Sequence, residues 1–184
     1  MFYTFWYHLP PYAVPNRPVF RTKRPNRNIL RRKTSISCHA IPSDMAMIPP
    51  KVKALFEDHK SALKYFALAT ASKEGVPNVV PIGFLWVAND KEIWVVDNYL
   101  NKTYANIKEN PVAAVYAIGG EGGHECVQVK GAVRYFDFGD DYEEAVKMAH
   151  AKNPAFPAKG LIKIIVTDVY DTTPGENAGK KYKQ

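Results

Sequence analysis

The sequence predicts a mainly β (α+β) domain: a six-stranded antiparallel β-barrel with a few flanking helices. Six runs after residue 46 are rich in Val, Ile and aromatic residues, as strands are. Short turns that contain Gly, Asn or Asp separate several of these runs, and three segments have the apolar spacing of a helix. Closure into a small barrel removes the edges that such a sheet would otherwise expose.

The folded part is expected to begin near residue 47 with a helix over 51–60, because Pro49 and Pro50 suit the first turn of a helix. Strands are then expected over 65–70, 77–87 and 92–96. The turns that join them are tight, so the three strands should form an antiparallel meander. Pro81 and Gly83 lie inside the second run, which should therefore be an edge strand that is bent or bulged.

A short helix should follow, opening with Lys102 and Thr103 and stopping at Pro111. Further strands are expected over 112–118, 126–136 and 161–166. Between the last two, a second helix should begin with Asp140 or Asp141 as its cap. The domain should end near residue 173, followed by an exposed C-terminal tail over 174–184.

Residues 1–46 differ from the rest of the chain in composition. They contain eight Lys or Arg residues against Asp44 alone, a net charge of +7 that equals the charge of the whole protein. Six prolines and the absence of hydrophobic periodicity predict a disordered extension. Three interpretations remain open: translation from an upstream start codon, organellar targeting, and a basic arm that binds nucleic acid or an acidic membrane surface.

The remainder of the chain is electrically neutral, which argues against nucleic-acid binding by the folded domain. Cys38 and Cys126 lie in different settings and indicate neither a disulfide scaffold nor a metal site. No apolar run is long enough to span a membrane, and a cytoplasmic location is expected. Hydrolytic and metalloprotease motifs are absent from the sequence, so a cofactor is expected to supply any chemistry.

The opening of the short helix is the best candidate for a ligand site. Free N–H groups and a partial positive charge at a helix start favour a phosphate, and Lys102 and Thr103 would complement it. The simpler interpretation is an ordinary surface helix with a solvated lysine.

Three motifs carry a resemblance to a known family. They are Val79-Val80-Pro81-Ile82-Gly83-Phe84, then Lys102-Thr103-Tyr104-Ala105-Asn106-Ile107 running into Asn110-Pro111-Val112, then Val127-Gln128-Val129-Lys130-Gly131-Ala132. Together they resemble the FMN-binding split β-barrel family of pyridoxamine 5'-phosphate oxidase-like proteins and small bacterial FMN-binding proteins. The resemblance covers roughly residues 48–173 and implies a split barrel, a flavoprotein and a homodimer with flavin at the interface.

The resemblance also implies the site residues. Lys102 and Thr103 match positions that hold the FMN phosphate. Other positions match the flavin-ring strand (Val80, Pro81, Ile82), the strand end at the flavin or its ribityl chain (Val96, Asp97, Asn98) and an approach from the partner subunit (Gln128). The catalytic residues are not identified by any of these motifs.

Departures from the oxidase pattern argue against pyridoxamine 5'-phosphate oxidase activity itself. The C-terminal part lacks the Trp and the Arg-x-His segment of those enzymes, and Asn78 and Gly83 replace basic residues of the strand. An FMN-dependent oxidoreductase or electron-transfer protein of unknown substrate is therefore expected. The alternatives are a deazaflavin-dependent reductase and a non-catalytic flavin or haem carrier.

Overall fold

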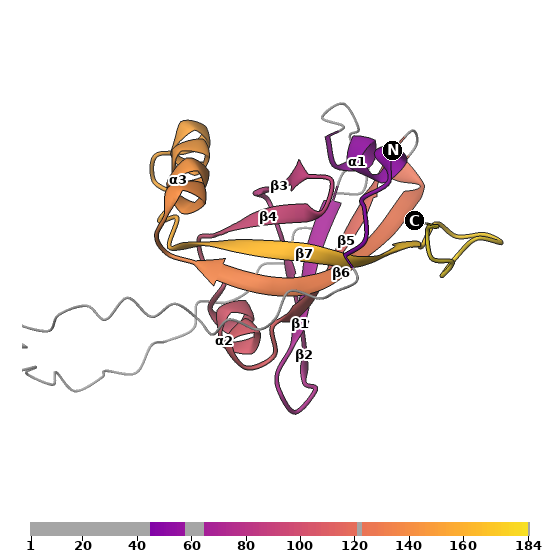
Figure 1. Cartoon of the computed structure of the whole chain (residues 1–184), viewed down its shortest axis with the longest axis horizontal. Helices are drawn as coiled ribbons and strands as arrows, with labels where there is room; N and C mark the ends of the chain where they lie inside the picture. Colours follow the sequence, from indigo (N-terminus) through magenta and orange to yellow (C-terminus); the bar gives the residue numbers. More distant parts are fainter. Residues whose placement is uncertain (1–44, 58–64, 121–122, 184) are drawn as a thin grey trace, which may run out of the picture. The chain divides into compact units, whose positions relative to one another are not determined.

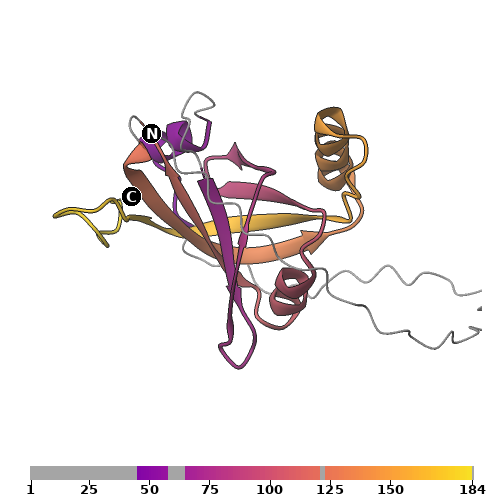
Figure 2. The ribbon, with the colours of Figure 1, turned by 180° about the vertical axis from the view of Figure 1, so that it is seen from behind.

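The structure is a computed structural model that describes residues 45–57, 65–120 and 123–183. The predicted basic extension lies almost wholly outside these residues, as does the end of the helix predicted over 51–60. The described part is a strongly curved antiparallel sheet with three helices (Figures 1 and 2). Among the described residues, no helix is long and apolar enough to cross a membrane.

The sheet has seven strands in the order β2-β1-β5-β6-β7-β4-β3. Their bounds are β1 Tyr65–Ala71, β2 Pro77–Pro81, β3 Leu85–Asn89, β4 Glu92–Asp97, β5 Val112–Gly119, β6 Glu125–Phe136 and β7 Gly160–Asp171. The mainly β antiparallel barrel is confirmed, but the strand count of six is wrong by one. The additional strand arises because the run predicted over 77–87 forms two separate strands.

The predicted meander is also wrong, for the same reason. β2 pairs with β1 and β3 pairs with β4, so two hairpins lie at opposite ends of the sheet order. Between them the chain crosses through Ile82–Phe84: the Ile82 N–H donates to Phe66 O (3.0 Å) and the Val96 N–H donates to Phe84 O (3.3 Å). Pro81 has no N–H for a continued ladder, and Gly83 favours a change of direction. We call residues 82–84 the crossing segment.

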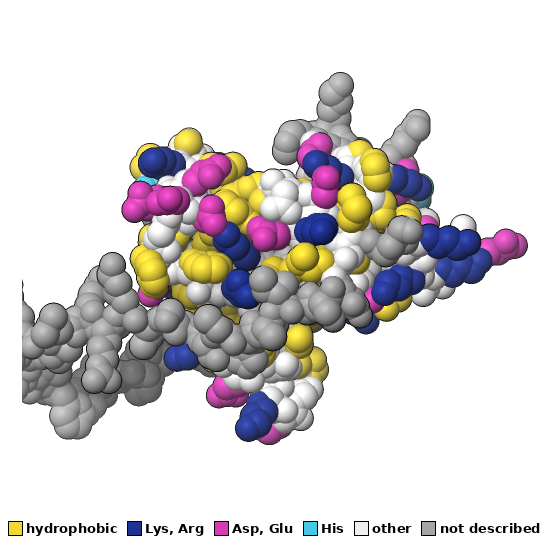
Figure 3. Space-filling view, in the orientation of Figure 1, with side chains coloured by type: hydrophobic (Ala, Val, Ile, Leu, Met, Phe, Trp, Pro, Cys, Tyr) yellow, Lys and Arg dark blue, Asp and Glu magenta, His cyan; other side chains and the backbone are white. Residues whose placement is uncertain are grey.

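The three helices are α1 (Pro50–Glu57), α2 (Asn101–Glu109) and α3 (Asp140–Lys152). α1 and α3 lie toward opposite ends of β7 in both ribbon views. The predicted cap of α3 is wrong: Gly139, at a φ of 97°, is the N-cap, and no side chain caps the helix. Asp140 and Asp141 lie in the first turn, where carboxylates favour the helix dipole, and Figure 3 shows acidic side chains gathered over α3.

Two hydrophobic clusters hold these elements together. The larger fills the barrel with inward-facing aliphatic side chains of the strands, together with Val52, Leu55 and Phe56 of α1 and Ile107 of α2. The smaller packs α3 against β4 and the start of β7, through Ala145 and Ala149 against Trp94 and Leu161. α3 therefore covers the side of β4 that faces away from the main core.

The close contact between β6 and β7 requires a residue without a β-carbon at Gly131, which can be tested. The pairing register shifts at Gly131, and a β-carbon there would clash with the Ile165 carbonyl oxygen and the Ile164 side chain. Gly131→Ala should lower the free energy of unfolding by about 1–3 kcal/mol, as overpacking does. Gly83→Ala is the matched control, since a β-carbon at Gly83 meets nothing within 4 Å. Chemical denaturation measures both, and equal stability of the two variants would contradict the contact.

Candidate functional site

A cavity of about 480 Å³ lies beside the crossing segment. It brings together five of the residues predicted from the sequence: Val80, Pro81, Ile82, Val96 and Asn98. Its remaining lining residues are Gly83, Phe84, Tyr99, Leu100, Lys152 and Phe156. The end of β2 and the end of β4 thus form one pocket, as the family resemblance implies.

The cavity reaches the start of α2, because Tyr99 and Leu100 line it and directly precede that helix. Leu100, the N-cap, provides no side-chain cap, and the first turn contains no acidic residue. The backbone N–H groups of Lys102 and Thr103 have no hydrogen-bond acceptor among the described residues. The helix start therefore offers free donors, and its first turn contains no carboxylate.

The side chains of Lys102 and Thr103 lie in different surroundings. Lys102 is exposed and forms no ion pair with any described residue. Thr103 is fully buried, and its Oγ1 accepts a hydrogen bond from Asn78 Nδ2 at 3.1 Å. The Asn78 and Asn106 amides also donate to Thr70, so the Thr103 hydroxyl belongs to a polar network between α2 and the β1–β2 hairpin. Its backbone N–H remains at the helix start.

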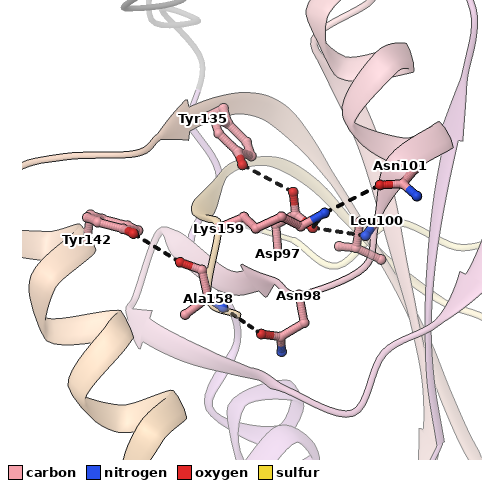
Figure 4. Close-up of polar contacts among 8 residues, drawn as sticks. All are labelled: Asp97, Asn98, Leu100, Asn101, Tyr135, Tyr142, Ala158 and Lys159. Atoms are coloured by element: carbon pink, nitrogen blue, oxygen red, sulfur yellow. Dashed lines mark hydrogen bonds and ion pairs between the residues drawn. The ribbon is translucent and has the colours of Figure 1, made fainter. Parts of the chain in front are cut away.

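Asp97 is a buried carboxylate that fixes the turn between β4 and α2 (Figure 4). Its Oδ1 accepts from the Leu100 N–H at 2.9 Å, and its Oδ2 accepts from the Tyr135 hydroxyl at 3.1 Å. Lys159 Nζ lies 3.8 Å from Oδ1. Asp97 does not line the cavity among the described residues; it holds in place the turn that does.

Asn98 and Tyr142 both hold Ala158, which lies two residues after the cavity-lining Phe156. Asn98 Oδ1 accepts from the Ala158 N–H at 3.0 Å, and the Tyr142 hydroxyl donates to Ala158 O at 3.0 Å (Figure 4). Ala158 has a φ of 39°, a left-handed conformation that costs an L-residue about 1–2 kcal/mol. The two hydrogen bonds offset this cost and tie the α3–β7 connection to the end of β4.

Gln128, like Asp97, Lys102 and Thr103, does not line the cavity, and it lies on a different strand from the other predicted residues. It lies on β6, half-buried, opposite Tyr116 of β5 and Tyr170 of β7. Sequence reasoning missed Lys152 and Phe156, which reach the cavity from the end of α3 and the loop that follows. Their spacing indicated only the end of a helix, so the sequence contained no signal that would have found them.

Comparison with known proteins identifies the family. The family model described as "Pyridoxamine 5'-phosphate oxidase" matches residues 48–173, more than half of the chain. The chain belongs to this family. It is also 34% identical over 119 residues to the uncharacterized protein MJ0282 of Methanocaldococcus jannaschii, a match that covers 61% of this chain and 76% of that protein.

Solved structures share the fold of this family member at low sequence identity. HupZ of Group A Streptococcus has a TM-score of 0.60 and 23% identity, covering 72% of this chain and 100% of that one. An FMN-binding protein from Syntrophomonas wolfei has a TM-score of 0.51 and 18% identity, covering 60% and 78%. An F420 reductase has a TM-score of 0.51 and 21% identity, covering 66% and 98%.

The Tyr135–Asp97 hydrogen bond gives a prediction about stability and pH. Burial, and secondarily the Asp97 carboxylate, raises the pKa of Tyr135 above its usual range. The folded protein therefore keeps this proton at a pH where the unfolded chain loses it, so stability should fall as pH rises above about 10. Tyr135→Phe should cost about 1.5–3 kcal/mol at neutral pH, the scale of a hydrogen bond to a charged group. The unfolding free energy of the Tyr135→Phe protein should then fall less steeply than that of the wild type as the pH becomes alkaline.

Tyr142→Phe is the comparison variant, because the Tyr142 hydroxyl donates to a neutral carbonyl oxygen. Its cost should be smaller, about 0.5–1.5 kcal/mol. Denaturant unfolding at neutral and alkaline pH measures both variants. A Tyr135→Phe protein with the same alkaline slope as the wild type would contradict the assignment.

Proposed function

We propose that this protein binds FMN non-covalently and acts as a flavin-dependent oxidoreductase or electron-transfer protein. The observation that best supports this proposal is a single cavity that extends from the crossing segment to the uncapped start of α2. Membership of the pyridoxamine 5'-phosphate oxidase family supports the same cofactor. Bound FMN would supply the redox chemistry, while the chain binds and orients it and excludes water.

The phosphate of FMN fits the start of α2. The backbone N–H groups of Lys102 and Thr103 are free donors there, and the exposed Lys102 ammonium adds a positive charge. The Thr103 hydroxyl already accepts a hydrogen bond from Asn78, so the Thr103 backbone is the better candidate for phosphate contact.

The ring system fits the other end of the same cavity. Val80 and Ile82 present apolar surface there, and Pro81 and Gly83 add little bulk, so a flat ring can approach the backbone closely. Val96 is buried at the end of β4 and gives the cavity an apolar wall. Asn98 is fixed by its hydrogen bond to Ala158 and provides an amide at the edge of that wall.

A second copy of the chain is the proposed partner. An outward face across β2, β1 and β5 combines small alanines with exposed apolar residues, Val79 (64% exposed) and Val112 (51%) among them. A hollow of about 510 Å³ extends from β1 and β5 of this face onto β6 and β7; five alanines line it, together with Lys130 and Asp168. Pro81 lies opposite Ala67 in the pairing of β2 with β1, so the face runs toward the FMN cavity. Gln128 of the partner is the proposed additional contact to the flavin.

Lys102 tests the phosphate end of the site. Lys102→Ala should weaken FMN binding by about 1.5–3 kcal/mol, the scale of a charge-assisted hydrogen bond, and leave riboflavin binding nearly unchanged. Lys108→Ala is the matched control, since Lys108 is an exposed lysine in the last turn of the same helix. Fluorescence titration of the flavin-free wild type and both variants, with FMN and with riboflavin, measures the affinities.

Two results would contradict this proposal. Equal FMN affinity in the Lys102→Ala protein and the wild type would remove Lys102 from the site. A purified protein that is colourless and gains no thermal stability from excess FMN would remove the cofactor, because a ligand of the native state must stabilise it. Stabilisation by the deazaflavin F420 in place of FMN would select the deazaflavin alternative.

A substitution at Val79 tests the proposed dimer interface. Val79→Glu should dissociate the dimer and weaken FMN binding with it, because a carboxylate would be buried in the proposed interface. Val76→Glu is the control: Val76 is 62% exposed but lies in the β1–β2 turn, outside the alanine face. Sedimentation velocity gives the oligomeric state. A monomeric wild-type protein that binds FMN tightly would contradict the interface.

A further inference from the structure

A second cavity, of about 720 Å³, lies against the same crossing segment and is lined mainly by aromatic and apolar side chains. It shares Pro81, Ile82, Gly83, Phe84 and Lys152 with the FMN cavity. The residues it does not share come from α1, β1, β3 and α3: Phe56, Tyr65, Phe66, Leu85, Trp86 and Met148. Neither the family match nor the predicted flavin contacts assign a ligand to these six residues.

The aromatic residues form two groups on different elements. Phe56 of α1 and Phe66 of β1 stack with their ring centroids 5.2 Å apart and an interplanar angle of 15°. Phe84 of the crossing segment and Trp86 of β3 meet edge to face, with their ring centroids 5.4 Å apart and an interplanar angle of 69°. A cavity bounded by both groups offers ring faces and edges to a flat aromatic ligand.

Lys152 is the one charged side chain among the described residues that line either cavity. Its Nζ donates to the Gly83 carbonyl oxygen at 3.1 Å and lies 5.2 Å from the centre of the Phe84 ring. No carboxylate of the described residues pairs with it. The Lys152 side chain is exposed, and its ammonium, hydrogen-bonded to the crossing segment and without a counter-ion among the described residues, can pair with a negatively charged ligand.

The size and the chemistry of the lining together favour a binding site over a packing defect. The volume lies within the roughly 300–1,000 Å³ of small-molecule sites, which are mostly apolar with a few placed polar groups. The cavity is also partly open at the surface, unlike a void that imperfect packing encloses in the interior.

We propose that this second cavity binds a planar aromatic anion. The ring lies among Phe66, Phe84 and Trp86, and the anionic group pairs with Lys152. The role of this ligand as the redox partner of the flavin rests on the proposed function, whereas its binding does not.

The test uses naphthalene sulfonate as the anionic probe and naphthyl methyl sulfone as its neutral counterpart. Calorimetric titration is carried out on the full chain, with and without saturating FMN. The sulfonate should bind both forms at one site per chain, and it should bind at least about tenfold more tightly than the sulfone because of the charge.

Two variants locate the site. Lys152→Gln should weaken the sulfonate about tenfold or more and the sulfone little, whereas Lys147→Gln, an exposed lysine of α3 that lines neither cavity, should change neither. Met148→Trp should abolish binding of both probes by filling the cavity, yet leave FMN binding intact, since Met148 is 39% exposed and lines only the second cavity.

Competition between the sulfonate and FMN would overturn the inference, because the probe would then occupy the flavin cavity. So would unchanged sulfonate affinity in Lys152→Gln or in Met148→Trp. Sulfonate binding that depends on Lys152 in a protein without affinity for any flavin would support this site and contradict the proposed function. Different results would therefore contradict the second binding site and the proposed function.

Discussion

The arrangement of the barrel depends on the crossing segment, residues 82–84. Its hydrogen bonds to β1 on one side and β4 on the other carry the chain from one edge of the sheet to the opposite edge. The two hairpins could not close the barrel in this order if the chain continued as one strand. The same segment forms a wall of both cavities, so the fold and the candidate site share one constraint.

A buried carboxylate provides the second constraint. Asp97 holds the Leu100 N–H on one oxygen and the Tyr135 hydroxyl on the other, which fixes how the chain turns from β4 into α2. Because these donors satisfy the carboxylate, its burial is tolerated. The direction of α2, and therefore of its free N–H groups, follows from this turn. Asp97 thus positions the proposed phosphate site without contacting it.

Hydrophobic periodicity is sufficient to predict most helices and strands. Local sequence signals fail where hydrogen bonds to residues distant in sequence determine the structure. The alternation along 126–136 predicted β6, and the end of the predicted flavin strand does meet the end of β4. Pro81 and Gly83 indicated a bend, but the break depends on acceptors and donors in β1 and β4 that are remote in sequence. The hydrogen bond from Asn78 to Thr103 spans 25 residues, and no local pattern reveals which way that hydroxyl points.

The two cavities also suggest why the sequence contains no obvious acid–base pair. Transfer of electrons or hydride between two bound molecules requires closeness and orientation, and the cofactor supplies the reactive atoms. The crossing segment lines both cavities, and the Gly83 carbonyl oxygen accepts a hydrogen bond from the Lys152 ammonium. With the proposed flavin and the proposed anion both bound, Lys152 would orient the anion without taking part in proton transfer. A site built for this purpose needs one fixed charge and flat apolar walls, and the described lining consists largely of these.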